Sequence, residues 1–92
     1  MDKYYVYIIE CSDGTLYTGI SQNYVSRIRD HNLGKGASYT RSRRPVKLVY
    51  LEIRNDYNSA RGRELAIKRM RRTKKLQLCI WYDRKKFLGR KT

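Results

Sequence analysis

The chain has 92 residues, of which 40% are hydrophobic and 33% are charged, so it can hold one small domain with a single core and no second module. Lys and Arg number 22 against 8 Asp and Glu, and the formal net charge of +14 favours a polyanionic partner. No 18-residue apolar run, signal peptide or lipidation motif is seen, so we expect a cytoplasmic monomer that binds nucleic acid and no membrane.

The first two predicted elements are strands that form a hairpin. Residues 4–10 and 15–20 are rich in β-branched and aromatic residues, and residues 12–14 between them read Ser-Asp-Gly. Alternation along a strand makes the loop length decisive for Tyr7 and Tyr17. A three-residue loop with Gly14 in the left-handed conformation would place both tyrosines on one face, whereas a two-residue loop would separate them.

The remaining predicted elements are a helix, a third strand and two further helices. A short amphipathic helix begins at residue 22 and stops at Gly34, residues 35–44 form a basic loop, and residues 46–53 form a third strand after Pro45. Ser59 can cap a second helix and Thr73 a third. This order predicts an α+β fold, β-β-α-β-α-α, with a three-stranded, largely antiparallel sheet flanked by helices. We assign residues 1–82 to the domain and residues 83–92 to a basic C-terminal tail.

Two isolated polar residues have both a structural and a functional interpretation. His31 is the only histidine; it lies at the edge of the buried stripe of its helix, where it could simply complement the helix dipole, but Arg27 lies one turn before it on the same face. Glu64 is the only carboxylate between Asp56 and Asp83, and it could form a helical ion pair with Lys68 or hold a divalent cation.

The cysteines favour a structural role. Cys11 and Cys79 are far apart and lack the spacing of metal ligands, and a single histidine cannot complete a zinc site with them. We expect both to be small buried hydrophobic residues in a reducing compartment.

The ordered set of motifs resembles the GIY-YIG nuclease superfamily, in particular its small single-domain bacterial branch. The set comprises Tyr5-Val6-Tyr7, Tyr17-Thr18-Gly19, then Arg27 and His31, then a glutamate on a later helix, and the similarity extends from Tyr4 to about Ile80. The resemblance implies a metal-dependent endonuclease that hydrolyses DNA phosphodiester bonds with Mg²⁺ (or Mn²⁺). Branched or irregular DNA, in repair or recombination, is the expected substrate.

The resemblance also implies a role for each site residue. Tyr7 would be the general base or the relay to it, with a pKa that nearby cations must depress from about 10. Tyr17 would orient metal-bound water, and Arg27 would neutralise charge on the scissile phosphate. His31 would position or deprotonate Tyr7, and Glu64 would hold the metal ion that stabilises the leaving 3′ oxygen.

One departure from the family keeps other functions open. Many members carry an asparagine where this chain has Cys79, so a non-catalytic nucleic-acid-binding domain is the alternative, followed by a ribosome- or RNA-associated protein. All three share a predicted nucleic-acid-binding stretch after the first helix. Its residues are Lys35, Tyr39, Arg41, Arg43, Arg44 and Lys47.

Overall fold

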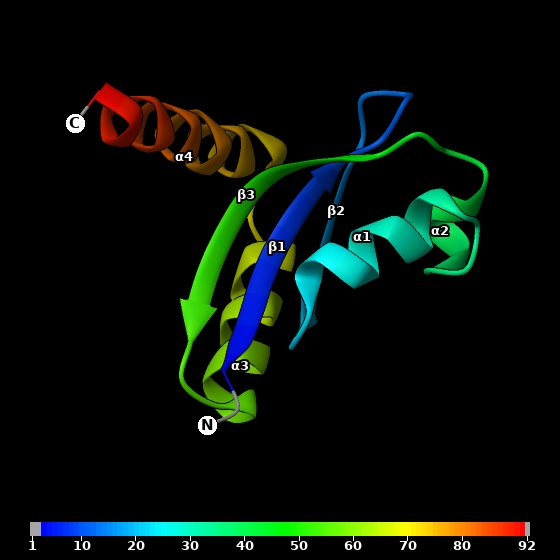
Figure 1. The fold of residues 1–92 in the computed structure, drawn as a ribbon, viewed down its shortest axis with the longest axis horizontal. Helices are drawn as coiled ribbons and strands as arrows, with labels where there is room; N and C mark the ends of the chain where they lie inside the picture. The colour runs from blue at the N-terminus through cyan, green and yellow to red at the C-terminus, as the bar shows by residue number, and fades with distance from the viewer. Residues whose placement is uncertain (1–2, 92) are drawn as a thin grey trace.

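The computed structural model describes the backbone of residues 3–91 and the side chains of residues 3–85. Within that range the elements are β1 Tyr4–Glu10, β2 Leu16–Ser21, α1 Tyr24–Asn32, α2 Ser38–Arg41, β3 Lys47–Arg54, α3 Tyr57–Lys68 and α4 Arg72–Lys91 (Figure 1). The predicted α+β order is confirmed, with one addition. The short helix α2 lies in the segment that we expected to be a loop.

The sheet is antiparallel throughout, in the order β2-β1-β3. β1 is therefore the central strand and is covered on both faces, which explains its continuous apolar run. Val6, Tyr7, Ile8 and Ile9 are all buried, with exposed fractions of 1% or less.

The hairpin between β1 and β2 closes through the three-residue loop. Cys11 N–H donates to the Thr15 carbonyl at 2.8 Å, and Gly14 has a φ of 84°, which is the left-handed conformation that glycine adopts without strain. In this register odd-numbered residues of β1 lie opposite odd-numbered residues of β2. Tyr7 and Tyr17 therefore share one face of the sheet, as the longer of the two loops predicts.

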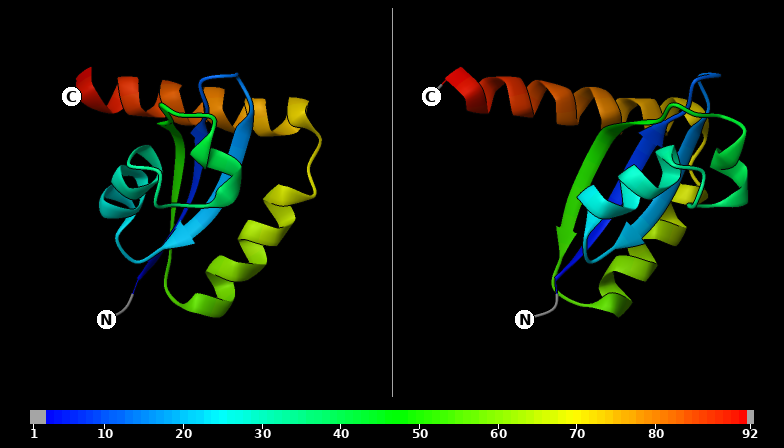
Figure 2. Two further views of the ribbon diagram at one scale, coloured as in Figure 1. Left: turned by 90° about the vertical axis from the view of Figure 1, so that its right-hand side faces the viewer. Right: turned by 45° about the vertical axis from the view of Figure 1, so that its right-hand side comes forward.

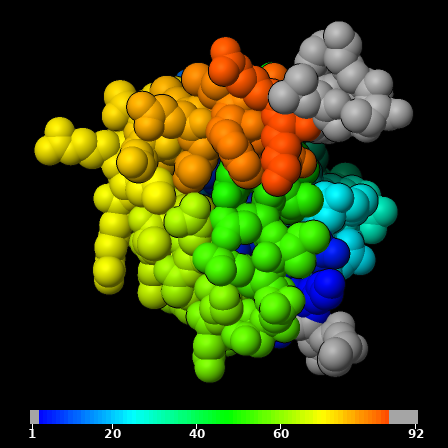
Figure 3. All heavy atoms as spheres, turned by 90° about the vertical axis from the view of Figure 1, so that its left-hand side faces the viewer, coloured from blue at the N-terminus to red at the C-terminus, as the bar shows by residue number. Residues whose placement is uncertain are grey.

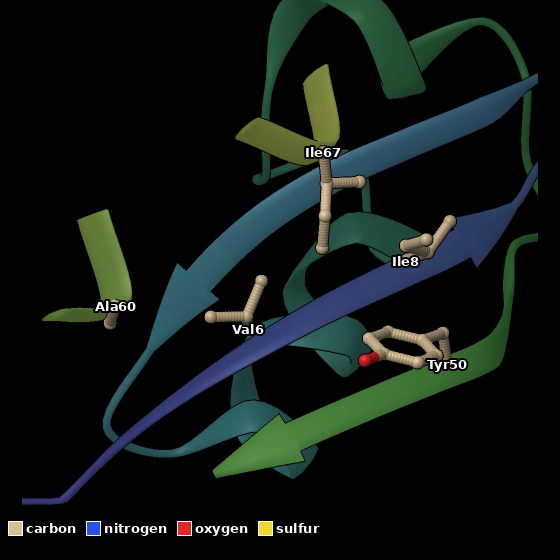
Figure 4. Packing of buried hydrophobic residues seen from close by; sticks show 5 residues of the cluster. All are labelled: Val6, Ile8, Tyr50, Ala60 and Ile67. Atoms are coloured by element: carbon tan, nitrogen blue, oxygen red, sulfur yellow. The ribbon is translucent and has the colours of Figure 1, made fainter. Parts of the chain in front are cut away.

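The two faces of the sheet carry separate cores. On one face Val6 and Ile8 pack with Tyr50, Ala60 and Ile67 (Figure 4). This face is covered by α3 and by the middle of α4. The opposite face holds α1, and the edge-on view in Figure 2 shows α1 and α3 on opposite sides of the strands. The buried residues of that second core are Tyr7, Ile9, Cys11 and Val46.

Two predicted helix starts are corrected. α3 is capped by Asp56, whose carboxylate accepts from Ser59 N–H at 2.7 Å, so Ser59 lies inside the first turn. An aspartate caps a helix as well as a serine does, and it occurs earlier in the chain. α4 begins at Arg72, so Thr73 also lies inside its helix.

The predicted tail is part of α4. The helix continues to Lys91 across residues 83–91, and its C-terminal half extends away from the sheet (Figure 1). No proline interrupts this stretch, and its Arg, Lys and Leu residues are good helix formers.

Asn32, the last residue of α1, ties this helix to the beginning of β3. Its Nδ2 donates to the Val46 carbonyl at 3.0 Å, and Val46 N–H donates to its Oδ1 at 2.7 Å. The side chain thus satisfies both backbone groups of Val46 as a neighbouring strand would, and it holds the segment that contains α2 against the sheet.

The surface is basic where α3 meets α4. The side chains of this junction project from the face shown in Figure 3, where α3, β3 and α4 are seen side by side. Its exposed residues include Lys68, Arg69, Arg71, Arg72 and Lys74.

Across residues 3–91, no helix combines the length and the apolar character that crossing a membrane would require.

Candidate active site

Tyr7 is the centre of the candidate site. Its side chain is 1% exposed, and its phenol lies across Gly19, the residue opposite it on the edge strand β2. A Cβ atom at position 19 would lie only 2.6 Å from Tyr7 Cζ. Only glycine therefore lets the phenol reach the outer edge of the sheet.

The imidazole of His31 lies at the hydroxyl end of the Tyr7 ring. The imidazole is fully buried, with Nε2 3.0 Å from the Tyr7 hydroxyl and Nδ1 2.8 Å from Thr40 Oγ1. Gly36 passes directly over the ring, since a Cβ there would lie 2.7 Å from His31 Cγ. The imidazole is therefore fixed at both nitrogens and by close packing of the loop.

The pKa values of this pair correct one expectation. Burial raises the pKa of Tyr7 to about 12 and outweighs the positive charge of Arg27, which lowers it. The expected depression by nearby cations is therefore wrong. Burial, followed by the charge of Arg27, also lowers the pKa of His31 below its usual value, while Asp30 raises it. At pH 7 the pair is consequently a neutral phenol beside a neutral imidazole.

Tyr17 and Arg27 complete this side of the site. The Tyr17 ring contacts the edge of His31 at a centroid distance of 5.3 Å and stacks on Tyr39 at 5.9 Å with an interplanar angle of 21°. Arg27 lies one turn before His31 on α1, is half-buried, and acts electrostatically on both Tyr7 and His31. The structure thus brings four of the five predicted catalytic residues together.

Glu64 approaches from α3, on the other face of the sheet. Its carboxylate is near enough to Tyr7 for its charge to contribute to the raised pKa of the phenol. The side chain is buried and bonded to two cations, with Oε1 2.7 Å from Arg61 Nη1 and Oε2 3.1 Å from Lys68 Nζ. The predicted helical ion pair with Lys68 is present, and Arg61 is an additional partner.

Glu64 is a carboxylate that could serve a magnesium ion as a single protein ligand. Each carboxylate oxygen has two lone pairs and uses one on a cationic side chain, so hard oxygen donors remain available. Mg²⁺ commonly binds one or two carboxylates and fills its other positions with water and substrate phosphate. Among the described residues, no group of three His, Cys, Asp or Glu side chains could hold a metal ion together, so Glu64 would contribute a single carboxylate.

The predicted nucleic-acid-binding stretch divides into two groups. Tyr39 and Arg43 contact other side chains at the surface: Arg43 Cζ lies 4.0 Å from the centre of the Tyr39 ring, which is itself exposed, and Arg43 Nε donates to Asp13 at 3.0 Å. Arg41 and Arg44 instead line a cavity of about 440 Å³. Lys35 is exposed, and so is Lys47, whose Nζ lies 3.6 Å from Glu10.

Sequence reasoning missed Thr40 and Gly36. Thr40 is fully buried behind His31, and its neighbours in the sequence gave no sign of this because the segment is basic and lacks an apolar period.

Of the two cysteines, Cys11 is buried as predicted. Cys79 is partly buried on α4, where it packs against the core of the α3 side and lines a cavity of about 450 Å³ between α4 and β3.

Comparison with known proteins agrees with this arrangement. Residues 3–77 match the GIY-YIG catalytic domain. A UPF0213 protein of Syntrophus aciditrophicus is 57% identical over 79 residues, which cover 85% of this chain and 91% of that protein. A UPF0213 protein of Staphylococcus saprophyticus is 51% identical over 78 residues, covering 85% and 95% respectively.

A solved structure supports the same relationship. The solution NMR structure of a UPF0213 protein of Bacillus halodurans has a TM-score of 0.54 and 43% sequence identity, covering 83% of this chain and 81% of that one. The domain match spans both tyrosine motifs, Arg27, His31 and Glu64. The chain therefore belongs to the GIY-YIG nuclease family, in its small single-domain bacterial branch.

Proposed function

We propose that this protein is a divalent-metal-dependent endonuclease that hydrolyses phosphodiester bonds in branched or irregular DNA, in repair or recombination. The buried hydrogen bond between the Tyr7 hydroxyl and His31 Nε2 is the observation that carries the proposal. A strand tyrosine does not need a buried histidine for packing, and a nucleic-acid-binding surface needs neither residue. Proton transfer is what this pair is built to perform.

The raised pKa of Tyr7 defines how the proton moves. A phenol with a pKa of about 12 is protonated at neutral pH, so it can accept a proton from the attacking water only by releasing its own. His31 Nε2, 3.0 Å away, is the acceptor, and the lowered pKa of His31 keeps it unprotonated beforehand. Tyr7 is therefore a relay and His31 the terminal base.

The other residues stabilise charge and position the reactants. Arg27 supplies a guanidinium beside the phenol, where it neutralises charge that develops on the scissile phosphate. Tyr17, held by Tyr39 and His31, orients the attacking water. Glu64 would hold Mg²⁺ or Mn²⁺, which would supply Lewis-acid stabilisation of the leaving 3′ oxygen.

The net charge supports a nucleic-acid substrate that is recognised by its shape rather than by its base sequence. A net charge of +14 binds phosphates of any sequence, and phosphate contacts position a protein without reading bases. The basic junction of α3 and α4 and the cavity lined by Arg41 and Arg44 offer such contacts on separate parts of the surface. A junction or flap presents strands to both at once.

Cleavage of defined DNA structures tests the proposal. The protein is incubated with single-stranded, duplex, flap and four-way-junction DNA in Mg²⁺, Mn²⁺ or EDTA, and we expect metal-dependent cutting that favours the flap or the junction. Tyr7→Phe should reduce the rate at least ~100-fold, because proton transfer contributes about 10²–10⁴. Tyr4→Phe, a change of the same type at a tyrosine that packs against Tyr57, is the matched control and should cut normally.

A second candidate is a DNA-binding module without turnover. The observation that favours it is the pairing of Glu64 with both Arg61 and Lys68, which already neutralises the carboxylate that a metal ion would need. This candidate predicts salt-sensitive DNA binding and no cutting of any of the four substrates in either metal. That result would replace the nuclease proposal.

A further inference from the structure

Thr40 lies directly behind His31, on the side away from Tyr7. Its side chain is fully buried, and its Oγ1 is 2.8 Å from His31 Nδ1 and 3.0 Å from the carbonyl of Ala37. A chain of hydrogen bonds therefore runs from the Tyr7 hydroxyl through both nitrogens of the imidazole to Thr40 and the backbone.

Counting protons along this chain selects one tautomer of His31. A carbonyl can only accept, so the Thr40 hydroxyl donates to Ala37 and has only lone pairs left for the imidazole. Nδ1 must then carry the proton and donate to Thr40, which leaves Nε2 unprotonated and able to accept from Tyr7. In this arrangement the Tyr7 hydroxyl, His31 Nδ1–H and the Thr40 hydroxyl each donate to a partner.

The opposite tautomer makes fewer hydrogen bonds. With the proton on Nε2, the imidazole would donate to Tyr7 and Thr40 would donate to Nδ1, so the bond from Thr40 to Ala37 would be lost. The phenolic proton would need another acceptor, and within residues 3–85 the only acceptor that bonds to the hydroxyl is the His31 ring, because the neighbouring Arg27 can only donate. A buried donor without a partner is unfavourable, so this arrangement is the weaker one.

We propose that Thr40 is a positioning residue that holds His31 in the Nδ1–H tautomer and so keeps Nε2 available to the Tyr7 proton. The catalytic consequence rests on the proposed function, whereas the tautomer itself does not. When the phenolic proton moves from Tyr7 Oη to Nε2, the ring becomes an imidazolium whose Nδ1–H still donates to Thr40. No hydrogen bond behind the ring has to be remade during the transfer.

The short helix α2 explains why Thr40 can fix the proton. Its backbone is held within the turn, since Thr40 N–H donates to the Ala37 carbonyl at 3.2 Å and Arg43 N–H donates to the Thr40 carbonyl at 3.0 Å. The preceding residue, Tyr39, is stacked between Tyr17 and Arg43. One turn of helix thus orients Tyr17 from one residue and His31 from the next.

NMR of the imidazole nitrogens tests the tautomer without any substrate. His31 is the only histidine, so protein without a polyhistidine tag, labelled with ¹⁵N-histidine and studied near pH 8, gives one pair of ring signals. We expect a protonated Nδ1 and an unprotonated Nε2 in the wild type and in Thr40→Ser, which keeps the hydroxyl. Thr40→Val replaces the hydroxyl with a methyl group, and the ratio of Nδ1–H to Nε2–H should fall about tenfold or more.

Either of two outcomes would overturn the assignment of the tautomer to Thr40. A wild-type spectrum with the proton on Nε2 is sufficient by itself, whatever the variants do. An unchanged tautomer ratio in folded Thr40→Val would also overturn it, because the hydroxyl would then not determine where the proton resides.

Kinetics tests the consequence for cleavage. Thr40→Val should lower kcat by roughly 10- to 1,000-fold with KM within about twofold, and Thr40→Ser should restore most of the rate, because only the proton relay is affected. An unchanged kcat in Thr40→Val would contradict the positioning role. If the wild type shows the Nδ1–H tautomer but cuts no DNA, the proposed nuclease function fails while the assignment of Thr40 stands.

Discussion

Replacing Gly19 by alanine should displace the Tyr7 phenol and destabilise the fold. The new Cβ would lie 2.6 Å from Tyr7 Cζ and 3.1 Å from Cε1, whereas carbon atoms pack best at about 3.5–4.0 Å, so the ring must move by roughly 1 Å. The ring is 1% exposed and has no free space to enter. The φ of Gly19 is not positive, so backbone strain does not contribute.

The expected cost combines overpacking and a lost hydrogen bond. Overpacking a core costs about 1–3 kcal/mol, and loss of the bond from Tyr7 to His31 adds about 1 kcal/mol. Gly19→Ala should therefore lower the free energy of unfolding by about 2–4 kcal/mol. For a domain of this size that corresponds to a fall in Tm of at least about 8 °C.

Chemical denaturation followed by circular dichroism measures this change, and two further variants make the result specific. Gly62→Ala lies on α3 with no atom within 4 Å of the new Cβ, so it should stabilise the protein by about 0.5–1 kcal/mol. In a Tyr7→Leu background, where the end of the ring is absent, Gly19→Ala should cost much less. Wild-type stability of Gly19→Ala in the native background would refute the reasoning.

Three further predictions concern metal, salt and pH. Glu64→Gln should abolish metal-dependent cutting while DNA binding is kept or slightly improved, although the loss of the ion pairs of this buried carboxylate with Arg61 and Lys68 should lower stability. Glu10→Gln is the control of equal charge and should cut normally, and a Glu64→Gln protein that cuts as well as wild type would place the activity elsewhere. The logarithm of the duplex-binding constant should fall by about 0.9 per contacted phosphate for each unit of log salt concentration, and a salt-insensitive affinity would argue against nucleic acid as the partner. The pKa of His31 in the folded protein lies below its unfolded value near 6.5, so the unfolded chain binds the proton first as the pH falls. The stability that His31 contributes should therefore be fully present above pH 6.5. It should fall as the pH drops toward the folded pKa, by up to about 1.4 kcal/mol per pH unit. Denaturation curves between pH 7.5 and 5 check this last prediction, and a slope that persists in His31→Gln would assign it to other groups.

The features that local sequence decides were predictable. Strand alternation and loop length together give the shared face of Tyr7 and Tyr17, and the three-residue loop ending in Gly14 has the chemistry that fixes the register. The 3.6-residue period placed Arg27 and His31 on one face of α1. These relations extend over a few residues, so no tertiary information is needed.

The features that tertiary packing decides were not predictable. The composition of residues 35–44 does not show that Tyr39 stacks on Tyr17 or that Arg43 pairs with Asp13, because these contacts form only when α2 folds back onto the hairpin. The pKa of Tyr7 is raised because burial outweighs a nearby cation, and the degree of burial of a side chain is a property of the folded molecule. Thr40 acquires its role only through its contact with His31, nine residues away in the sequence.

The position of β1 in the middle of the sheet determines the order of events during synthesis on the ribosome. Its hairpin partner β2 follows within a few residues, but its other neighbour, β3, pairs Leu51 with Tyr7 and is made only later. At roughly 5–20 residues per second, the delay between these two residues is about 2–9 s. During that interval the hairpin exposes one unpaired, strongly apolar edge, and a nascent chain in this state is most exposed to pairing with another copy of itself.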